Sequence, residues 1–417
     1  MQVEYGTRNI ELEDWKLRNL YHLLGATRTS LVEGGNWLVS RIYPTGPILH
    51  ERDLNFIYSS VWGMHSSGVH PSILSKCFRW IETALKPNGD FYFEGEPEYH
   101  RIGLRGYRAF SILKVAAWVK DPLANNNVVL DRLMQYQDQS GGVYDYIGEK
   151  PGKIEDPVTN ITALNTCFFG HTMVALDRKD AALKAGEWLR RYVEANVKHM
   201  REKGVMYTET DIKGNLKLQI ADPDSILGTV NLVDAKQEFW QVGVVMSYLA
   251  LLYDVMRTRW GFNETEAQPM LKMALELNEF ESRMPLYTYR YPSKCKVAWG
   301  AGELLRVLSK YRLGTQDQIE KALNNTKNTL ETTFIDNQLP NGAWSCDHYV
   351  VSKKDIEYQF EYKPLKGLVN VPAYPLAGTK TSFIEPEELA GEFLGEMKAG
   401  EEGIVALIDS IVSNNSP

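Results

Sequence analysis

Apolar residues recur along this chain at helical spacing. After Pro71-Ser72, the residues at 73, 74, 77, 78, 81, 84 and 85 form one apolar stripe, which predicts a one-faced helix ending at Pro87-Asn88-Gly89. The segments 106–119 and 239–253 are apolar over more of their circumference. Such segments are typical of helices packed on both sides. The pattern therefore predicts an outer layer of one-faced helices around an inner layer of buried ones.

A glycine followed closely by an aromatic residue recurs after the predicted helices. The first three of these glycines are separated by 54 and 53 residues, the next follows after 62, and a gap of 138 leaves room for a further unit whose aromatic residue is Tyr287. The glycines are Gly35, Gly89, Gly142, Gly204 and Gly342. Repeats of this length, each a helix pair closed by a turn, predict a solenoid bent into a closed ring.

The fold predicted from this spacing is all-α, an (α/α)6 barrel of six helix-hairpin repeats that forms a single domain over residues 1–417. Inner helices are expected to begin near Leu54, Gly103, Val158, Asp234, Ser293 and Glu385, and outer helices near Pro71, Ala124, Lys179, Asn263 and Gln316. A further outer helix, over about 11–32, would close the ring against the C-terminal segment. The long loops 91–102, 144–159 and 207–233 are expected at one mouth of the barrel, where loops on a rigid scaffold commonly carry chemistry.

Composition and charge limit the classes of partner that the chain can bind. The 417 residues are 44% hydrophobic, 24% charged and carry a net charge of −7, and no Lys/Arg run offers a basic face to nucleic acid. The apolar stretch 242–253 is too short for a membrane span and is interrupted by Ser247. We therefore expect a small apolar metabolite as the partner, with no nucleic acid and no membrane span, and a homo-oligomer is left open.

Neither a metal nor a cofactor is expected. The four cysteines (Cys77, Cys167, Cys295 and Cys346) are scattered singly, which indicates reduced thiols and, with no signal peptide in view, a cytoplasmic location. Cys167 and His171 have i, i+4 spacing but no third ligand of matching type nearby in sequence. The stretch Gly300-Ala301-Gly302 has no phosphate-loop lysine and indicates close helix packing.

Candidate catalytic residues lie where the inner helices begin. Tyr58 and Tyr107, in first turns of successive inner helices, would donate hydrogen bonds to a substrate oxygen, or simply pack with satisfied hydroxyls. Asp156, before Pro157, would act as a base or an orienting group, or cap the helix. Arg105 is a further donor candidate, with a solvated cluster of charges at the rim as the alternative.

Aromatic and polar residues at the same level are expected to bind substrate. They are Trp62, His65, Phe110, Asn165, Phe168, Glu238, Trp240 and Trp299. Glu303 and the glutamates at 385, 387 and 388 are further mouth candidates, with an ordinary surface position as the alternative for each.

At the helix entries the sequence resembles the linalool dehydratase/isomerase family over about residues 50–250. The stretch from His50 to Tyr58-Ser59 is similar to the family segment that contains its active-site tyrosine. Residues 88–91 and 102–107 resemble its Asp-Gly-Phe-Gly stretch and the following Ile-x-x-Lys-Gly-His, with Tyr107 in place of the catalytic histidine. Residues 156–165 resemble its Cys-Glu-Pro run, with Asp156 at the acidic position and Glu155 and Leu164 at the two cysteine positions.

The resemblance implies an α/α barrel and cofactor-independent acid/base chemistry on an isoprenoid alcohol. Terpenoid cyclases with the same toroid are a weaker match. The stretch 133–142 is faintly similar to their Gln-Trp repeats, but their DxDD and DDxxD signatures are absent from the sequence.

Three functions are weighed. The first is a cofactor-independent cyclase or isomerase, including a dehydratase or a cycloaddition catalyst, for a terpenoid or polyketide-derived intermediate of secondary metabolism. Its enclosed cavity would hold a reactive conformer and exclude water. The second is a carbohydrate-active enzyme, a glycoside hydrolase, lyase or epimerase, which would need two carboxyls across an open cleft. The third is a non-catalytic ring that binds a partner or a lipid, which predicts a filled centre and an exposed apolar patch on the rim.

Overall fold

The chain is mostly helical, as predicted for an all-α protein. The structure is a computed structural model that describes residues 14–42, 54–96, 104–148, 160–211, 213–219, 228–234, 237–344 and 386–414. Its α-helices are α1 (Asp14–Ile42), α2 (Ser60–Ser66), α3 (Pro71–Glu82), α4 (Arg105–Val119), α5 (Asn127–Met134), α6 (Ala163–Ala175), α7 (Lys179–Lys203), α8 (Trp240–Thr258), α9 (Glu264–Glu281), α10 (Cys295–Tyr311), α11 (Gln316–Asn328) and α13 (Pro386–Asn414). Short 3₁₀ helices are η1 (Leu54–Phe56), η3 (Pro122–Asn125), η4 (Leu286–Arg290) and η5 (Pro292–Lys294), and the π-helix η6 (Thr329–Ile335) prolongs α11.

One set of helices is buried around most of its circumference. We call α2, α4, α6, α8, α10 and α13 the central helices. Their contacts form a circuit, because each packs on the next in this order and α13 packs back on α2. In α4 every residue from Arg105 to Ala116 is buried, and most of α8 is buried as well. The prediction that 106–119 and 239–253 pack on both sides is thus confirmed.

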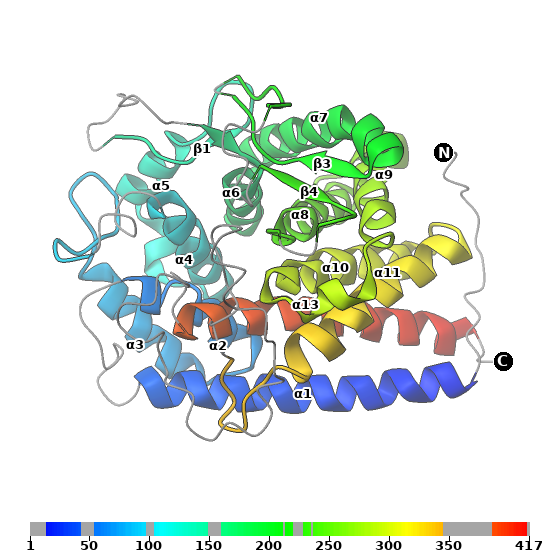
Figure 1. Ribbon diagram of the computed structural model, residues 1–417. Helices are drawn as coiled ribbons and strands as arrows, with labels where there is room; N and C mark the ends of the chain where they lie inside the picture. The colour runs from blue at the N-terminus through cyan, green and yellow to red at the C-terminus, as the bar shows by residue number, and fades with distance from the viewer. Residues whose placement is uncertain are drawn as a thin grey trace.

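The remaining helices cover this circuit. Helix α3 contacts α2, α5 contacts α4, α7 contacts α6, α9 contacts α8 and α11 contacts α10. The long helix α1 lies along α13, so that the first and last described helices are neighbours, as the blue and red ribbons of Figure 1 show. Four outer helices begin within a residue of the predicted positions, since α3 starts at Pro71, α7 at Lys179 and α11 at Gln316, and α9 follows its cap Asn263.

Glycines allow several central helices to approach closely. A Cβ on Gly243 would lie 2.1 Å from the carbonyl oxygen of Lys296, and one on Gly300 would lie 2.3 Å from the carbonyl oxygen of Gly243. A Cβ on Gly391 would lie 2.4 Å from the carbonyl carbon of Ser59. Helices α8 and α10, and likewise α2 and α13, therefore touch through backbone. The packing role expected for Gly300 is confirmed.

Glycine turns follow several helices as predicted, but some lie at other glycines than the predicted ones. Gly89 and Gly342 have φ of +91° and +89°, but at the third turn the left-handed residue is Gly141, with φ +98°, rather than Gly142. In all three turns a single antiparallel bridge joins residues six apart around the glycine: Leu85–Phe91, Gln137–Val143 and Gln338–Trp344. Thr210–Leu216 repeats the arrangement around Gly214, so the fourth such turn lies there, whereas Gly204 ends α7.

Two expectations at the repeat ends are corrected. Gly35 lies inside α1, which runs on to Ile42 instead of ending near residue 32. It is a packing glycine, since a Cβ there would lie 2.4 Å from the Ser67 hydroxyl oxygen. Tyr287 lies in the 3₁₀ helix η4 and is 45% exposed, outside any such glycine turn.

Short strands hold two of the loops. β1 (Val143–Tyr144) pairs antiparallel with β2 (Ile161–Thr162), with Val143 opposite Thr162. β3 (Val205–Tyr207) pairs antiparallel with β4 (Thr229–Asn231), with Met206 opposite Val230. β2 leads directly into α6, so this central helix starts at Ala163, later than the position near 158 that the pattern predicted.

Candidate functional site

A stripe of carboxylates on α13 faces the middle of the molecule. Glu388, Glu392 and Glu396 are spaced four residues apart, so they lie on one face of the helix. All three are buried. Buried carboxylates are strongly disfavoured unless they are hydrogen-bonded or paired, so the groups around this stripe define the chemistry of the centre.

Two tyrosines predicted as catalytic meet this stripe. The Tyr58 hydroxyl donates to Glu388 Oε1 at 2.5 Å and lies 3.4 Å from Glu392 Oε1, and the Tyr107 hydroxyl also donates to Glu392 Oε1. Their rings touch edge to face with centroids 5.5 Å apart. Burial, reinforced by the neighbouring carboxylates, raises the pKa of both phenols well above the ordinary value. Both therefore remain hydrogen-bond donors at neutral pH.

Lys296 of α10 completes the group. Its Nζ lies 2.6 Å from Glu392 Oε2 and 3.1 Å from Glu396 Oε1. Burial lowers the pKa of Lys296, but the two carboxylates outweigh burial and raise it well above the ordinary value. Burial raises the pKa of Glu396 to about 7, against the opposing charge of Lys296. We call Tyr58, Tyr107, Lys296, Glu388, Glu392 and Glu396 the central polar cluster.

Within the described ranges, one set of side chains has metal-ligand spacing. Ligand atoms of Cys295, Glu392 and Glu396 lie within 4.8 Å of one another. The ammonium of Lys296 is already ion-paired with both carboxylates. It supplies the positive charge that a metal ion would bring, so these residues do not point to a metal.

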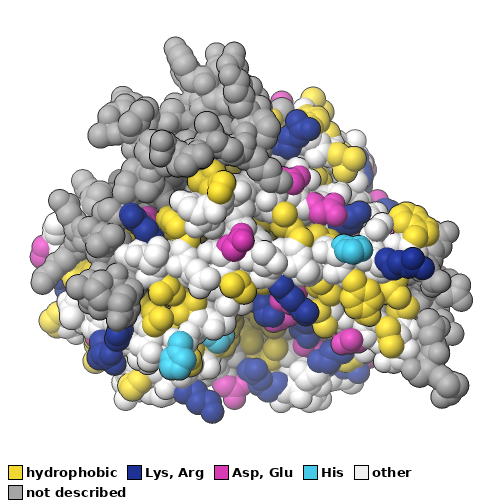
Figure 2. Space-filling view, turned by 90° about the horizontal axis from the view of Figure 1, so that it is seen from below, with side chains coloured by type: hydrophobic (Ala, Val, Ile, Leu, Met, Phe, Trp, Pro, Cys, Tyr) yellow, Lys and Arg dark blue, Asp and Glu magenta, His cyan; other side chains and the backbone are white. Residues whose placement is uncertain are grey.

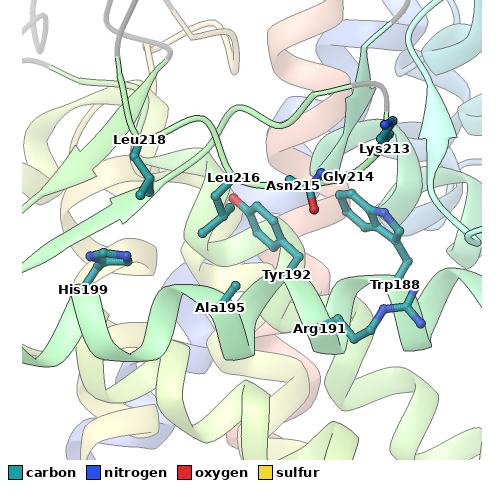
Figure 3. A pocket seen from close by; sticks show the side chains of 10 residues that line it. All are labelled: Trp188, Arg191, Tyr192, Ala195, His199, Lys213, Gly214, Asn215, Leu216 and Leu218. Carbon is teal, nitrogen blue, oxygen red and sulfur yellow. The ribbon is translucent and has the colours of Figure 1, made fainter.

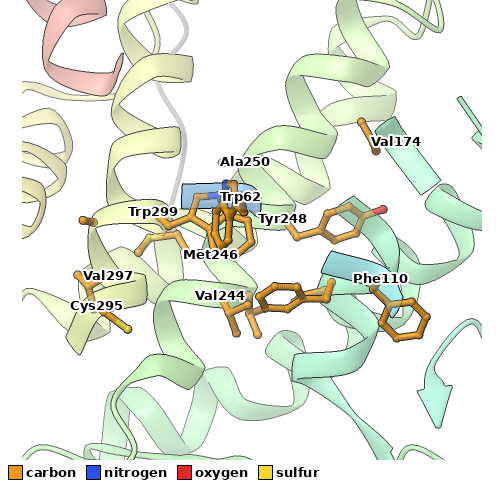
Figure 4. Close-up of a cluster of buried hydrophobic side chains, with 14 of the residues drawn as sticks. Trp62, Phe110, Val174, Val244, Met246, Tyr248, Ala250, Cys295, Val297 and Trp299 are labelled. Atoms are coloured by element: carbon orange, nitrogen blue, oxygen red, sulfur yellow. The ribbon is translucent and has the colours of Figure 1, made fainter. Parts of the chain in front are cut away.

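Three aromatic residues predicted to bind substrate come together beside the cluster. Trp62, Phe168 and Trp299 come from α2, α6 and α10, and Trp299 lies 4.8 Å from Trp62 and 5.5 Å from Phe168 between ring centroids. Phe168 also packs on Tyr107 at 4.4 Å, which joins the aromatic wall to the polar cluster. Figure 4 shows Trp62 and Trp299 side by side, with Tyr248 beyond them. This part of the centre is filled by side chains.

A second lysine lies against this wall. Lys114 Nζ is 3.4 Å from the centroid of the Trp62 ring, 4.9 Å from that of Trp299 and 5.3 Å from that of Phe168. The side chain is fully buried, and its Nζ has no hydrogen-bond partner among the described residues. Burial lowers the pKa of Lys114 to about 7, although Glu392 and Glu396 oppose the effect. Burial and the charge of Lys114 also lower the pKa of His171, whose Nε2 lies 3.0 Å from Ser247 Oγ.

Glu238 adjoins the cluster just before α8. Burial raises its pKa to about 8, against the charge of Lys296. Its Oε2 is buried without a hydrogen-bond partner in the described part of the chain. Trp240, at the first position of α8, packs half-buried against the core. Glu238, Glu392 and Tyr107 are all buried, each with only a few per cent of its surface exposed.

Arg105 lies in a different group of charges. Its Nη1 is 3.1 Å from Asp90 Oδ2, and Arg132 holds the other oxygen of the same carboxylate at 2.9 Å. The Arg105 guanidinium lies over the Tyr92 ring, 4.7 Å from its centroid. Arg105 is therefore bound to a different carboxylate from the tyrosines of the cluster, and its catalytic role stays a prediction.

Three other predicted residues also lie apart from the cluster. Phe110 packs on Tyr136 and Phe169, and Figure 4 shows it away from Trp62 and Trp299. Asn165 donates to Asp145 Oδ1 at 2.9 Å, next to the β1–β2 pair. His65 is exposed and packs on Trp118 near the end of α4. Asp156, with Glu155, falls outside the described residues, so its predicted role stays a prediction.

The two surface pockets that the structure describes are built from other residues. One, about 450 Å³ in volume, lies between α7 and the segment 213–218, where Trp188 and Tyr192 stack with centroids 5.5 Å apart (Figure 3). The other, about 400 Å³, is lined by residues around Met134 and Asp177. The face shown in Figure 2 mixes acidic, basic and hydrophobic side chains. It therefore offers no single-sign surface to a polyanion.

Sequence reasoning missed most of the charges at the centre. Lys114, Lys296, Glu392 and Glu396 were not singled out, although a signal existed. The stripe Glu388-Glu392-Glu396 interrupts a C-terminal segment that is otherwise rich in Leu, Phe, Met and small residues. Glutamates at i, i+4 and i+8 on the same face as buried apolar residues indicate an inward polar stripe.

Within the described residues, no helix is long and apolar enough to cross a membrane. Comparison of the chain with protein-family models, with curated proteins and with solved structures gives no match.

Proposed function

We propose that the chain is an (α/α)6-barrel enzyme that isomerises or cyclises an apolar terpenoid or polyketide-derived intermediate without a cofactor, using its own side chains as acid and base. The observation that carries the proposal is the hydrogen bond from Tyr107 to Glu392, which Lys296 pairs at 2.6 Å, next to the bond from Tyr58 to Glu388. This group lies against the aromatic wall of Trp62, Phe168 and Trp299 through the contact of Tyr107 with Phe168.

The group has the parts of a proton relay. Glu392, which is ion-paired with Lys296 and accepts the Tyr107 hydrogen bond, can take the Tyr107 proton while the phenol oxygen takes a proton from a substrate carbon or hydroxyl. The same relay run backwards protonates a substrate. Fixed donors and acceptors in a water-poor centre contribute to acid/base catalysis because they need little reorganisation during the reaction. The aromatic faces would stabilise positive charge that develops on the substrate.

The resemblance to the linalool dehydratase/isomerase family supports this proposal at two positions. Tyr58, which matches the family's active-site tyrosine, is bonded to Glu388. Tyr107, which replaces the family's catalytic histidine, is bonded to Glu392 and so keeps a proton-exchanging group at that place. The circuit of central helices supports the barrel part of the proposal.

The geometry supports the carbohydrate alternative less well. A glycosidase needs two carboxyls on either side of the scissile bond. Glu388 and Glu392 are instead one helical turn apart on α13 and share the hydroxyl of Tyr58. The third reading, a non-catalytic ring, fits the filled aromatic part of the centre but leaves the buried relay without a role.

The test is turnover with matched variants. The purified chain is incubated with small-molecule extracts, and products are followed by mass spectrometry; a product of unchanged mass indicates isomerisation or cyclisation, and loss of one water indicates dehydration. We expect Tyr107→Phe and Glu392→Gln to lower kcat by about 100-fold or more, the usual contribution of a general acid/base. Tyr136→Phe is the control, because Tyr136 is also buried but lies among Phe110 and the Asp90 group. Equal loss in Tyr107→Phe and Tyr136→Phe, or no loss in either, contradicts the proposal.

A further inference from the structure

Lys114 is a buried amine with no role in the relay. It comes from the third turn of α4, and its Nζ reaches the face of Trp62 at 3.4 Å, with Trp118, Phe168 and Trp299 around it. No described residue accepts a hydrogen bond from it. Buried lysines are normally paired, so this arrangement is unusual for a structural residue.

The charged and titratable groups near Lys114 come from four helices. Glu392 and Glu396 of α13 act on Lys114 as opposite charges, and Lys296 of α10 acts as a like charge. The charge of Lys114 in turn helps to lower the pKa of His171 of α6 and of His65 of α2. The nearest aromatic rings exclude water. A lysine is activated as a nucleophile by desolvation in an apolar pocket next to another cationic group. Lys114 has both features, with Lys296 as the second cation.

We propose that Lys114 forms an imine with an aldehyde or ketone group of an apolar substrate. The proposal rests on the function proposed above and names the substrate class for that site. The Trp62, Phe168 and Trp299 rings already pack against Nζ. They would therefore have to move aside for the carbonyl carbon to reach it, and an apolar chain would then pack on their faces. A carbonyl also fits the polar cluster, since its oxygen needs a proton donor.

The bond changes balance without an oxidant or reductant. The Nζ lone pair attacks the carbonyl carbon, the C=O π electrons move to oxygen, and that oxygen takes a proton from a buried acid such as Glu396, whose pKa burial raises to about 7. Nitrogen then loses a proton, the hydroxyl is protonated and leaves as water, and a C=N bond remains. Protonation of this imine makes the adjacent C–H acidic, which is the property an isomerisation by the Tyr107–Glu392 relay requires. Hydrolysis by one water returns Lys114 and the carbonyl product.

The experiment traps the imine in the full-length protein. The chain is incubated at pH 7 with propanal or octanal and sodium cyanoborohydride, and peptides are mapped by mass spectrometry. At pH 7 about half of an amine with a pKa of about 7 is unprotonated, whereas an ordinary lysine is unprotonated to roughly one part in 2,500. We therefore expect Lys114 to be alkylated at least about tenfold faster than Lys120, an exposed lysine at the end of the same helix.

Each outcome decides the proposal. Faster alkylation of Lys114 by either aldehyde, and loss of that adduct in Lys114→Met, supports it. Labelling no faster than at Lys120 with both probes, or labelling that appears only after denaturation, overturns it. The proposed function is tested separately. Turnover that depends on Tyr107 without labelling of Lys114 supports the relay and contradicts the imine. Labelling of Lys114 without turnover that depends on Tyr107 supports the imine and contradicts the relay.

Discussion

Two fully buried lysines are expected to affect stability in opposite directions. Lys114 has no hydrogen-bond partner among the described residues, whereas Lys296 is ion-paired with Glu392 at 2.6 Å and Glu396 at 3.1 Å. Substituting methionine for either one keeps an unbranched side chain that is one heavy atom shorter, and removes the charge. The pair therefore isolates the effect of the partner carboxylates from that of burial.

The magnitude for Lys114 follows from its pKa. A fall from 10.5 to about 7 on folding means that the protonated form is penalised by roughly 5 kcal/mol, at about 1.36 kcal/mol for each factor of ten. Attraction of the ammonium to the face of Trp62 recovers about 2 kcal/mol. Burial is the larger effect. Lys114→Met is thus expected to raise the free energy of unfolding by roughly 3 kcal/mol at pH 7.

The pH dependence has a definite sign. Between pH 7 and 10.5 the unfolded chain binds a proton at Lys114 that the folded chain does not, so wild-type stability from this group rises with pH over this window. The advantage of Lys114→Met is therefore largest at or below pH 7 and vanishes near pH 10.5. Lys296→Met leaves two carboxylates buried without their cation, so its free energy of unfolding should be about 3–5 kcal/mol lower than that of wild type at pH 7.

The assay is urea and thermal unfolding followed by circular dichroism at pH 7 and at pH 9.5. A Lys114→Met variant that is no more stable than wild type at pH 7, or an advantage that does not shrink by pH 9.5, would refute the reasoning. So would a Lys296→Met variant as stable as wild type. In either case the assignment of one paired and one unpaired lysine would be wrong.

Three further predictions concern stability, all measured by thermal unfolding. Gly391→Ala should lower the free energy of unfolding by about 1–3 kcal/mol or more, because the new Cβ would lie 2.4 Å from the Ser59 carbonyl carbon. Gly25→Ala in helix α1, where nothing lies within 4 Å of the new Cβ, should raise it by about 0.5–1 kcal/mol. Equal effects of the two substitutions would contradict the backbone contact. Thr315→Ala should lose about 1 kcal/mol through the capping box of α11, and an unchanged melting temperature would show that the cap contributes nothing. Burial raises the pKa of Asp145 from 3.8 to about 6, so between these pH values the folded chain binds a proton at Asp145 that the unfolded chain does not, and wild-type stability falls as pH rises. The stability of Asp145→Asn relative to wild type should therefore increase from pH 4 to pH 6. A stability difference that stays constant over this range would argue against the pKa shift.

Helix positions were accessible from the sequence because periodicity and caps are local. The stripe after Pro71 predicts α3, and the predicted starts near Asn263 and Gln316 match α9 and α11, whose caps are local as well. The end of α1 was not accessible. Gly34 and Gly35 look like a turn, but in the structure their missing side chains make room for Leu394 and Ser67, and that contact depends on segments far away in the sequence.

The aromatic part of the centre could be predicted for the same kind of reason. Trp62, Tyr107 and Phe168 lie near the start of segments that pattern alone identifies as buried helices, and helices packed in a circuit bring such positions together. The charged part could not. A glutamate or lysine on a helix is normally solvated, and only the pairing of Lys296 from α10 with Glu392 from α13 makes its burial acceptable.

The unpaired amine at the centre has no structural account in the described contacts. The ion pair of Lys296 explains why its charge is tolerated, but Lys114 meets aromatic faces alone. A single substitution to methionine would remove the penalty of its burial, so stability gives no reason for a lysine here. Groups that are costly to bury, lie beside other titratable residues and titrate near neutral pH concentrate at functional sites. Lys114 and the proposed Tyr107–Glu392 relay thus point to the same place, one through an amine without a hydrogen-bond partner and the other through an ion-paired carboxylate.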